Sequence, residues 1–164
     1  MARHVFYALH YEQDRARAAG ILASGALSAN LEATPNEWAK LQRSGDFAIQ
    51  RWIETQLKGR SCTIVLIGAH TAGRPWVTYE IKRSRQLKAA MIGVHIHRLA
   101  DANGNQSTKG ENPFEHPEAG LGSGARAVPV YDPPEGDSAS VYRYIADNIG
   151  RWADEAVAER RHWQ

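Results

Sequence analysis

The sequence lacks the features that mark several common classes of protein. Cys62 is its only cysteine, so no disulfide can form within the chain, and no apolar run approaches the roughly 18 residues of a membrane span. Its 20 Lys and Arg stand against 18 Asp and Glu, which leaves a net charge of +2 and no basic field for non-specific nucleic-acid binding. The first residues turn charged after a few apolar positions, so no signal peptide is expected. These absences predict a cytoplasmic protein that meets neither membrane nor nucleic acid.

Several catalytic and ligand-binding motifs are absent too. There is no Walker loop and no Gly-x-Ser-x-Gly elbow, and the glycines of residues 120–124 lie in a loop rather than between a strand and a helix. His95 and His97 are two apart on a predicted strand, so they face the same way and could share an ion. No Cys, Asp or Glu with ligand spacing completes that set. We therefore expect no metal site, and we expect Cys62 to be a small buried side chain.

What the sequence does have is the composition of a globular domain. With 164 residues, 43% hydrophobic and 23% charged, the chain is long enough to bury one core and too short for two ordinary enzyme domains. We expect a single domain over residues 1–164.

Strands and helices alternate along the chain. Short apolar runs predict strands, and apolar residues at helical spacing predict helices. Alternation of this kind predicts parallel strands with right-handed crossovers, hence an α/β fold with an open sheet covered by helices on both faces. The predicted strands cover residues 4–9, 62–68, 89–97 and 127–131, and the predicted helices cover 11–24, 44–59, 74–88 and 138–160.

The remaining segments are less regular. Residues 26–42 admit a short strand near their start, and Thr34-Pro35-Asn36 predicts a turn before Trp38. Residues 98–126 show no period and predict a long loop. In the helix over 44–59, Ser44 or Asp46 could serve as the cap, and the apolar face is expected to comprise Phe47, Ile49, Ile53 and Leu57.

Polar residues stand where the predicted strands end. His10 and Tyr11 follow the first strand, His70 and Thr71 follow "IVLIGA", and His97 follows "IGVHI". In open parallel sheets, ligands bind at the carboxyl ends of the strands, near the point where the strand order reverses. Their shared edge makes these residues candidates for ligand contacts.

Glu80 raises a further question in the stretch "RPWVTYEIKRS". At about 100° per residue, Val77, Ile81 and Ser84 should pack on the sheet, and Glu80 should lie beside them at the border of burial. One interpretation is a surface glutamate paired with Arg83 three residues on. The other is a carboxylate placed for chemistry, and periodicity alone leaves both open.

The residues resemble a known family at this point. Trp76-x-x-x-Glu80, on the helix after a central strand, resembles the motif that carries the catalytic glutamate of NAD-consuming TIR domains. The wider match is to the TIR-like proteins of bacterial Thoeris anti-phage defence. It rests on four segments in order: residues 3–11 with the strand ending in His-Tyr, Trp38 with Asp46 and Ala48, residues 65–81, and residues 92–114 with the Gly-Asn, Lys-Gly and Asn-Pro-Phe loop.

The resemblance implies a flavodoxin-like, TIR-like three-layer sandwich and an activity. It implies cleavage of the nicotinamide–ribose bond of NAD, which is consumed as substrate, so that no cofactor is expected. The ADP-ribosyl part would leave as a signalling nucleotide, often cyclic, that activates a separate effector protein. Self-association through contacts between TIR domains is also implied.

The same resemblance assigns roles to residues. Glu80 would be the catalytic carboxylate that holds the ribose hydroxyls and stabilises positive charge on the ribose. Phe6 and Trp76 are candidates to pack on nicotinamide or ribose, and the remaining candidates for substrate contacts are His10, Tyr11, Asp46 and His70.

Two other functions fit the expected topology. One is a non-catalytic TIR-like interaction module in which Glu80 and Trp76 support packing. The other is a receiver-like or flavin-binding domain, which is disfavoured because His10-Tyr11-Glu12 replaces the acidic pair of a phospho-acceptor site.

Overall fold

A five-stranded parallel sheet forms the centre of the protein. The computed structural model describes residues 4–24, 27–29 and 34–160. All neighbouring strands pair in parallel in the order β2-β1-β3-β4-β5, so the predicted α/β class with an open parallel sheet is confirmed. The order reverses between β1 and β3, which is where such folds bind ligands. The strands are β1 (His4–Ala8), β2 (Ser28–Ala29), β3 (Cys62–Ile67), β4 (Ala90–His95) and β5 (Val130–Tyr131).

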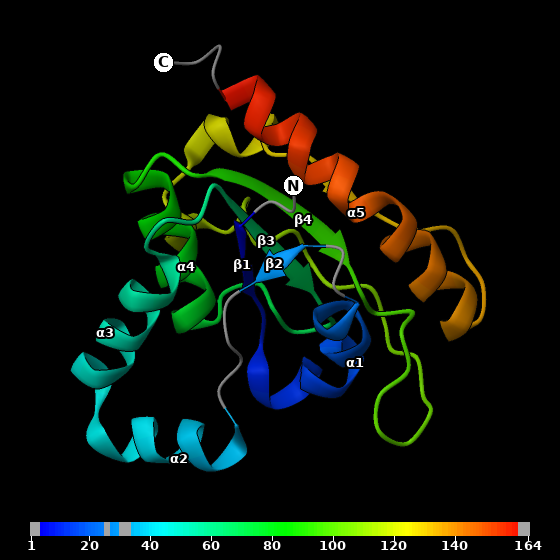
Figure 1. The fold of residues 1–164 in the computed structure, drawn as a ribbon, viewed down its shortest axis with the longest axis horizontal. Helices are drawn as coiled ribbons and strands as arrows, with labels where there is room; N and C mark the ends of the chain where they lie inside the picture. The colour runs from blue at the N-terminus through cyan, green and yellow to red at the C-terminus, as the bar shows by residue number, and fades with distance from the viewer. Residues whose placement is uncertain (1–3, 25–26, 30–33, 161–164) are drawn as a thin grey trace.

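Helices cover both faces of this sheet (Figure 1). Side chains of α1 and α5 pack on one face, and side chains of α3 and α4 pack on the other. The helix α2 has no fully buried residue and lies at the periphery, beyond the end of α3 (Figure 1). The helices are α1 (Tyr11–Ala23), α2 (Pro35–Ser44), α3 (Asp46–Leu57), α4 (Pro75–Gln86) and α5 (Ser138–Arg160).

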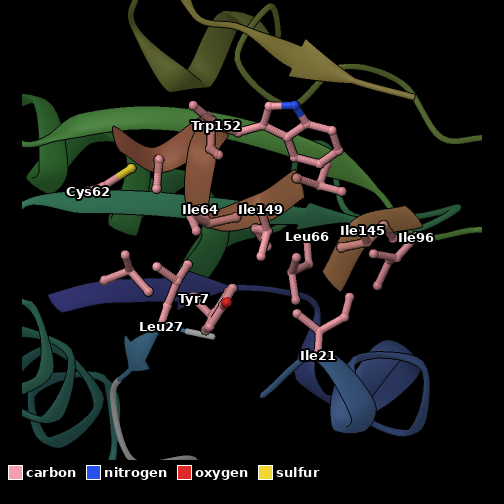
Figure 2. Close-up of a cluster of buried hydrophobic side chains, with 14 of the residues drawn as sticks. Tyr7, Ile21, Leu27, Cys62, Ile64, Leu66, Ile96, Ile145, Ile149 and Trp152 are labelled. Carbon is pink, nitrogen blue, oxygen red and sulfur yellow. The ribbon is translucent and has the colours of Figure 1, made fainter. Parts of the chain in front are cut away.

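The face toward α1 and α5 carries the larger core (Figure 2). Alternate side chains of the central strands, among them Ile64 and Leu66, meet Ile145 and Ile149 from α5. Each such side chain gives about 1.5–3 kcal/mol when it is fully buried. Cys62 belongs to this cluster and is buried, as the sequence predicts.

The opposite face carries a second core that supports the site described below. Phe6 and Val65 point from the strands toward Ile53 of α3 and Val77 and Ile81 of α4. The prediction that Val77, Ile81 and Ser84 form the packing face of the helix is confirmed, since all three are at most 2% exposed.

A polar tie fixes α4 on the sheet. The hydroxyl groups of Thr63 in β3 and Ser84 in α4 lie 2.7 Å apart, and both residues are fully buried. The Ser84 hydroxyl also donates to the Glu80 carbonyl at 2.7 Å. Buried polar groups cost free energy when they lack partners, so these hydrogen bonds resist sliding of α4 along β3. They thereby fix the position of the helical turn that carries Glu80.

Three local predictions are wrong. Thr34-Pro35-Asn36 is not a turn but the start of α2, where the Thr34 hydroxyl accepts from the Glu37 amide at 3.1 Å and Pro35 takes the first helical position. Phe47 lies off the packed face of α3 and is 72% exposed. The cap of α3 is Gly45, at φ +94, and neither Ser44 nor Asp46 provides a side-chain cap.

The stretch 98–126 contains short helical turns, 3-10 in type, at Pro117–Ala119 and Gly122–Ala127. β5 follows as an edge strand of two residues within the predicted strand over 127–131. Within the described ranges, no helix combines the length and the apolar character needed to cross a bilayer.

Candidate active site

A pocket of about 300 Å³ opens at the carboxyl end of β1. α1, α2, α3 and α4 each contribute side chains to its wall, so four separate segments of the chain build it. Its position beside the reversal of strand order is the one expected for a ligand site in this class of fold. The lining residues are Phe6, Tyr7, Leu9, His10, Tyr11, Glu12, Trp38, Gln42, Trp52, Arg74, Pro75, Trp76, Val77 and Glu80.

Glu80 lines this pocket from the second turn of α4. Its side chain is buried, with the residue 8% exposed, and its Oε2 atom is buried without a hydrogen-bond partner in the described part of the chain. Burial raises the pKa of this carboxyl group well above its usual value of 4.5. A buried carboxyl group with an unused oxygen is a marker of functional sites, because a purely structural role normally satisfies it.

The interpretation of Glu80 as the partner of Arg83 is wrong. Arg83 donates through Nε to Glu54 of α3, and the Tyr79 hydroxyl donates to the same Glu54 oxygen at 2.9 Å. These bonds tie α4 to α3 on the solvent side. They leave Glu80 turned toward the pocket, with no cation among the contributors to its pKa.

Aromatic rings form much of the remaining wall. Tyr11 and Trp38 contact at 5.4 Å between ring centroids, and Trp76 meets Tyr79 edge-on at 5.9 Å. The indole Nε1 of Trp38 is buried and has no acceptor among the described residues. The pocket therefore combines apolar rings with one unused donor and one unused acceptor, a combination suited to a planar ligand with polar edges.

α2 is fixed against α1 by a polar contact at the rim. Gln42 donates to the Glu12 carboxylate at 2.9 Å. Trp38 stands one helical turn before Gln42, so the two side chains lie on the same face of α2. This contact places the Trp38 ring in the wall although α2 itself buries no residue fully.

His10 is half-buried in the pocket wall, near the positive charge of Arg74 at the rim. Burial first, and then the charge of nearby Arg74, lower the pKa of His10 below its usual 6.5. Arg74, the cap residue of α4, donates through Nε to the His70 carbonyl at 3.0 Å. This hydrogen bond from a side chain to the backbone fixes the Arg74 side chain at the rim of the pocket.

The structure places the predicted site residues in three groups. Glu80, Trp76, His10 and Tyr11 line the pocket, and Phe6 reaches its floor as a core residue that is 1% exposed. His70 lies in the wall of a neighbouring cavity. Asp46 is the first residue of α3 and lines neither. The assignment of these side chains to substrate contacts stays a prediction.

The sequence missed Gln42, Trp52 and Arg74 as wall residues. Gln42 lies on α2, where the sequence predicts a turn at residues 34–36 and no helix directly after it. Without a predicted helix, the side of α2 on which Gln42 lies could not be assigned. Trp52 lies on α3 beside the buried Ile53, where helical spacing alone does not distinguish a pocket wall from core.

His95 and His97 lie close together without a third His, Cys, Asp or Glu ligand grouped with them in the described part of the chain. Their rings meet edge-on with centroids 5.7 Å apart, and no group of three His, Cys, Asp or Glu side chains within the described ranges could hold an ion. Burial lowers the pKa of His95 to about 4, which keeps it neutral near pH 7.

Another cavity, of about 430 Å³, opens at the opposite edge of the sheet. Met91 and Val128 line it, together with Arg160, whose guanidinium donates to the carbonyl groups of Ser61 and Lys88. It brings none of the predicted site residues together. The carboxyl edge therefore remains the candidate site.

The doubly covered parallel sheet and a pocket with Glu80 four residues after Trp76 match what the resemblance to TIR-like domains implies. The family described as "Thoeris protein ThsB, TIR-like domain" matches residues 6–101, more than half of the chain. The chain belongs to this family. A relative from Bacillus cereus (strain MSX-D12), named "Putative cyclic ADP-D-ribose synthase ThsB1", is 31% identical over 143 residues, covering 80% of this chain and 71% of the relative.

Proposed function

We propose that this protein cleaves NAD at the nicotinamide–ribose bond and joins the ADP-ribosyl part into a cyclic nucleotide that signals in anti-phage defence. The observation that carries the proposal is the buried carboxyl group of Glu80, which lines an aromatic pocket and whose Oε2 atom has no hydrogen-bond partner among the described residues. Membership of the ThsB family and the name of the Bacillus cereus relative support it.

The reaction places positive charge next to a carboxylate. When the bond between ribose C1′ and nicotinamide N1 breaks, its electron pair leaves with neutral nicotinamide and the ribose becomes oxocarbenium-like. An ionised Glu80 stabilises this charge strongly because its side chain is buried, where the effective dielectric constant is lower than in water. A nucleophilic group of the same substrate then bonds to C1′, which closes the ring, and one proton of the substrate is released to the solvent.

Substrate binding also adjusts the ionisation of Glu80. In the free protein the described residues offer no hydrogen-bond donor to Oε2, and burial disfavours the charge of the carboxyl group. Ribose hydroxyl groups that donate to Oε2 would stabilise the ionised form and lower the raised pKa. The Trp76 and Trp38 rings in the same wall offer flat apolar surfaces for nicotinamide.

The proposal includes partners. We propose that copies of the chain self-associate and that the nucleotide product acts on a separate effector protein of the defence system. The exposed Phe47 ring on α3 is the kind of side chain that supports an interface between copies.

The test is to identify the products of NAD. Purified protein is incubated with NAD over a range of protein concentrations, and the products are separated and weighed by mass spectrometry. We expect nicotinamide together with a nucleotide 18 mass units lighter than ADP-ribose, about the mass of one water, in amounts per protein that rise with concentration. Absence of nicotinamide release at every concentration would favour the non-catalytic interaction module instead.

A further inference from the structure

The pocket around Glu80 is too small for a whole dinucleotide. At about 300 Å³ it lies at the bottom of the range of roughly 300–1,000 Å³ for ligand pockets, so it suits one nucleoside rather than two joined by a diphosphate. If the nicotinamide riboside half lies against Glu80, the adenosine and the diphosphate must continue outside. The direction they take depends on the surface that adjoins the pocket.

A second cavity adjoins it at Arg74 and Pro75, which line both. This cavity has a volume of about 430 Å³ and is open to solvent. His70, Arg74 and Lys109 bring nitrogen donors to its wall. Planar guanidinium and ammonium groups are the side chains that bind phosphate oxygens most strongly, because the hydrogen bonds are charge-assisted.

The wall of this cavity is held in place by close backbone packing. A Cβ atom on Gly110 would lie 2.0 Å from the Gly68 carbonyl oxygen, so only glycine lets the loop after β4 approach the end of β3 this closely. Upstream, the same loop accepts two hydrogen bonds from the buried Arg17, at the carbonyl groups of Leu99 and Asn105. Lys109 therefore projects from a fixed segment.

The charged side chains that line the second cavity are of two kinds, the basic Arg74 and Lys109 and the acidic Glu111. Arg74 uses Nε on the His70 carbonyl, and Lys109 pairs with Asp132 at 2.9 Å while its side chain remains 54% exposed. Glu111 also lines the cavity and is exposed. A carboxylate repels phosphate and accepts from hydroxyl groups, so Glu111 suits the adenosine ribose and the basic side chains suit the diphosphate.

We propose that this second cavity binds the diphosphate and adenosine half of the dinucleotide, with Arg74 at the junction and with His70 and Lys109 on the diphosphate. The proposal rests on the proposed function for the identity of the substrate. It assigns to His70 a place on the phosphates rather than beside the nicotinamide, and it lets one chain hold both halves of its substrate.

The test measures binding of ADP-ribose, which contains the diphosphate and adenosine but no nicotinamide and is not cleaved. Calorimetric titrations compare the wild-type protein with His70→Gln, Arg74→Gln and Lys109→Gln. Each substitution should weaken binding roughly tenfold, since each removes a charge-assisted or polar contact to phosphate. The control is Lys58→Gln, which removes an exposed charge between α3 and the start of β3, at the opposite edge of the sheet from the cavity, and should leave affinity unchanged.

A second pair of variants guards against indirect effects of lost contacts such as the Lys109–Asp132 pair. Ala72 is half-buried in the cavity wall. Ala72→Glu adds bulk and a negative charge there, whereas Ala72→Gln adds nearly the same bulk without charge. The proposal expects ADP-ribose to bind more weakly to Ala72→Glu than to Ala72→Gln, with the difference shrinking as salt is added.

The outcomes separate this proposal from the proposed function. Failure of wild-type protein to bind ADP-ribose, or equal binding by the cavity variants and the wild type, overturns the assignment of the cavity. Nicotinamide release from NAD is measured on the same preparations. If nicotinamide is released while the cavity variants bind ADP-ribose as tightly as the wild type, the proposed function stands and the assignment of the cavity is wrong. If the cavity variants bind ADP-ribose more weakly but no nicotinamide is released, the assignment of the cavity stands and the proposed function is wrong.

Discussion

The carboxyl group of Glu80 lies in the protein without the hydration that a surface glutamate keeps. Its Oε2 atom has no partner among the described residues, and nothing but burial determines the direction of its pKa shift. A folded protein tolerates such a group only at a cost in stability. A ligand that donates hydrogen bonds to Oε2 would offset that cost. The proposed function therefore depends on Glu80 more than on any other residue.

We predict that Glu80→Gln changes how stability depends on pH. The folded pKa of Glu80 is raised, so between 4.5 and that raised value the carboxyl group ionises in the unfolded chain but stays protonated in the folded wild type, and stability falls as the pH rises. Glutamine cannot ionise and lacks this loss. Urea unfolding should give similar free energies near pH 5 and a variant that is about 1–3 kcal/mol more stable at pH 8.

The control for this prediction is Glu155→Gln on α5, which loses only an exposed pair with Arg151. That substitution should shift stability by at most about 0.5 kcal/mol, with little dependence on pH over the same window. A Glu80→Gln curve parallel to the wild type between pH 5 and pH 8 would show that the carboxyl group is not desolvated in the folded protein.

At the scale of elements, the site depends on how α4 is seated on β3. The Thr63 and Ser84 hydroxyl groups bond to each other in the core, and Ser84 bonds to the Glu80 carbonyl. On the solvent side Glu54 of α3 receives the Tyr79 hydroxyl and Arg83. α4 is thus fixed on two sides, and Glu80 between them is presented to the pocket.

We predict that the hydroxyl pair stabilises the fold as a unit. Ser84→Ala should lower the free energy of unfolding by about 1–3 kcal/mol, because it leaves the fully buried Thr63 hydroxyl without that partner. Adding Thr63→Val should restore most of the loss, since both polar groups are then gone. Urea unfolding of the two single variants and the double variant gives the coupling, and additive losses would contradict it.

The elements also show how far the sequence determines the site. Helical spacing around Val77 and Ile81 sufficed to predict α4 and its buried face, because long amphipathic patterns reflect packing on a sheet. α2 was missed since its helix begins at Thr34-Pro35, a pair that signals a turn as well as a helix start. Because α2 was not predicted, the position of Trp38 in the pocket wall could not be predicted either.

At the scale of the whole molecule, the topology decides where the chemistry lies. The parallel order β2-β1-β3-β4-β5 puts every strand end with its following loop on one edge. The sequence predicted this edge from the His residues after the strands. It could not predict which of them share a cavity, because His10 and His70 follow adjacent strands and yet line different cavities on either side of Arg74. Such separation depends on the packing of loops that have no periodic signal.

The role of Glu80 in catalysis is decided by the rate of nicotinamide release from NAD by wild type, Glu80→Gln and the control Glu155→Gln, each at the same concentration and each checked for folding. We expect Glu80→Gln to lower the rate at least about 100-fold, the usual scale for removing a preorganised electrostatic group, and the control to keep the wild-type rate. A Glu80→Gln variant that releases nicotinamide as fast as the wild type would contradict that role.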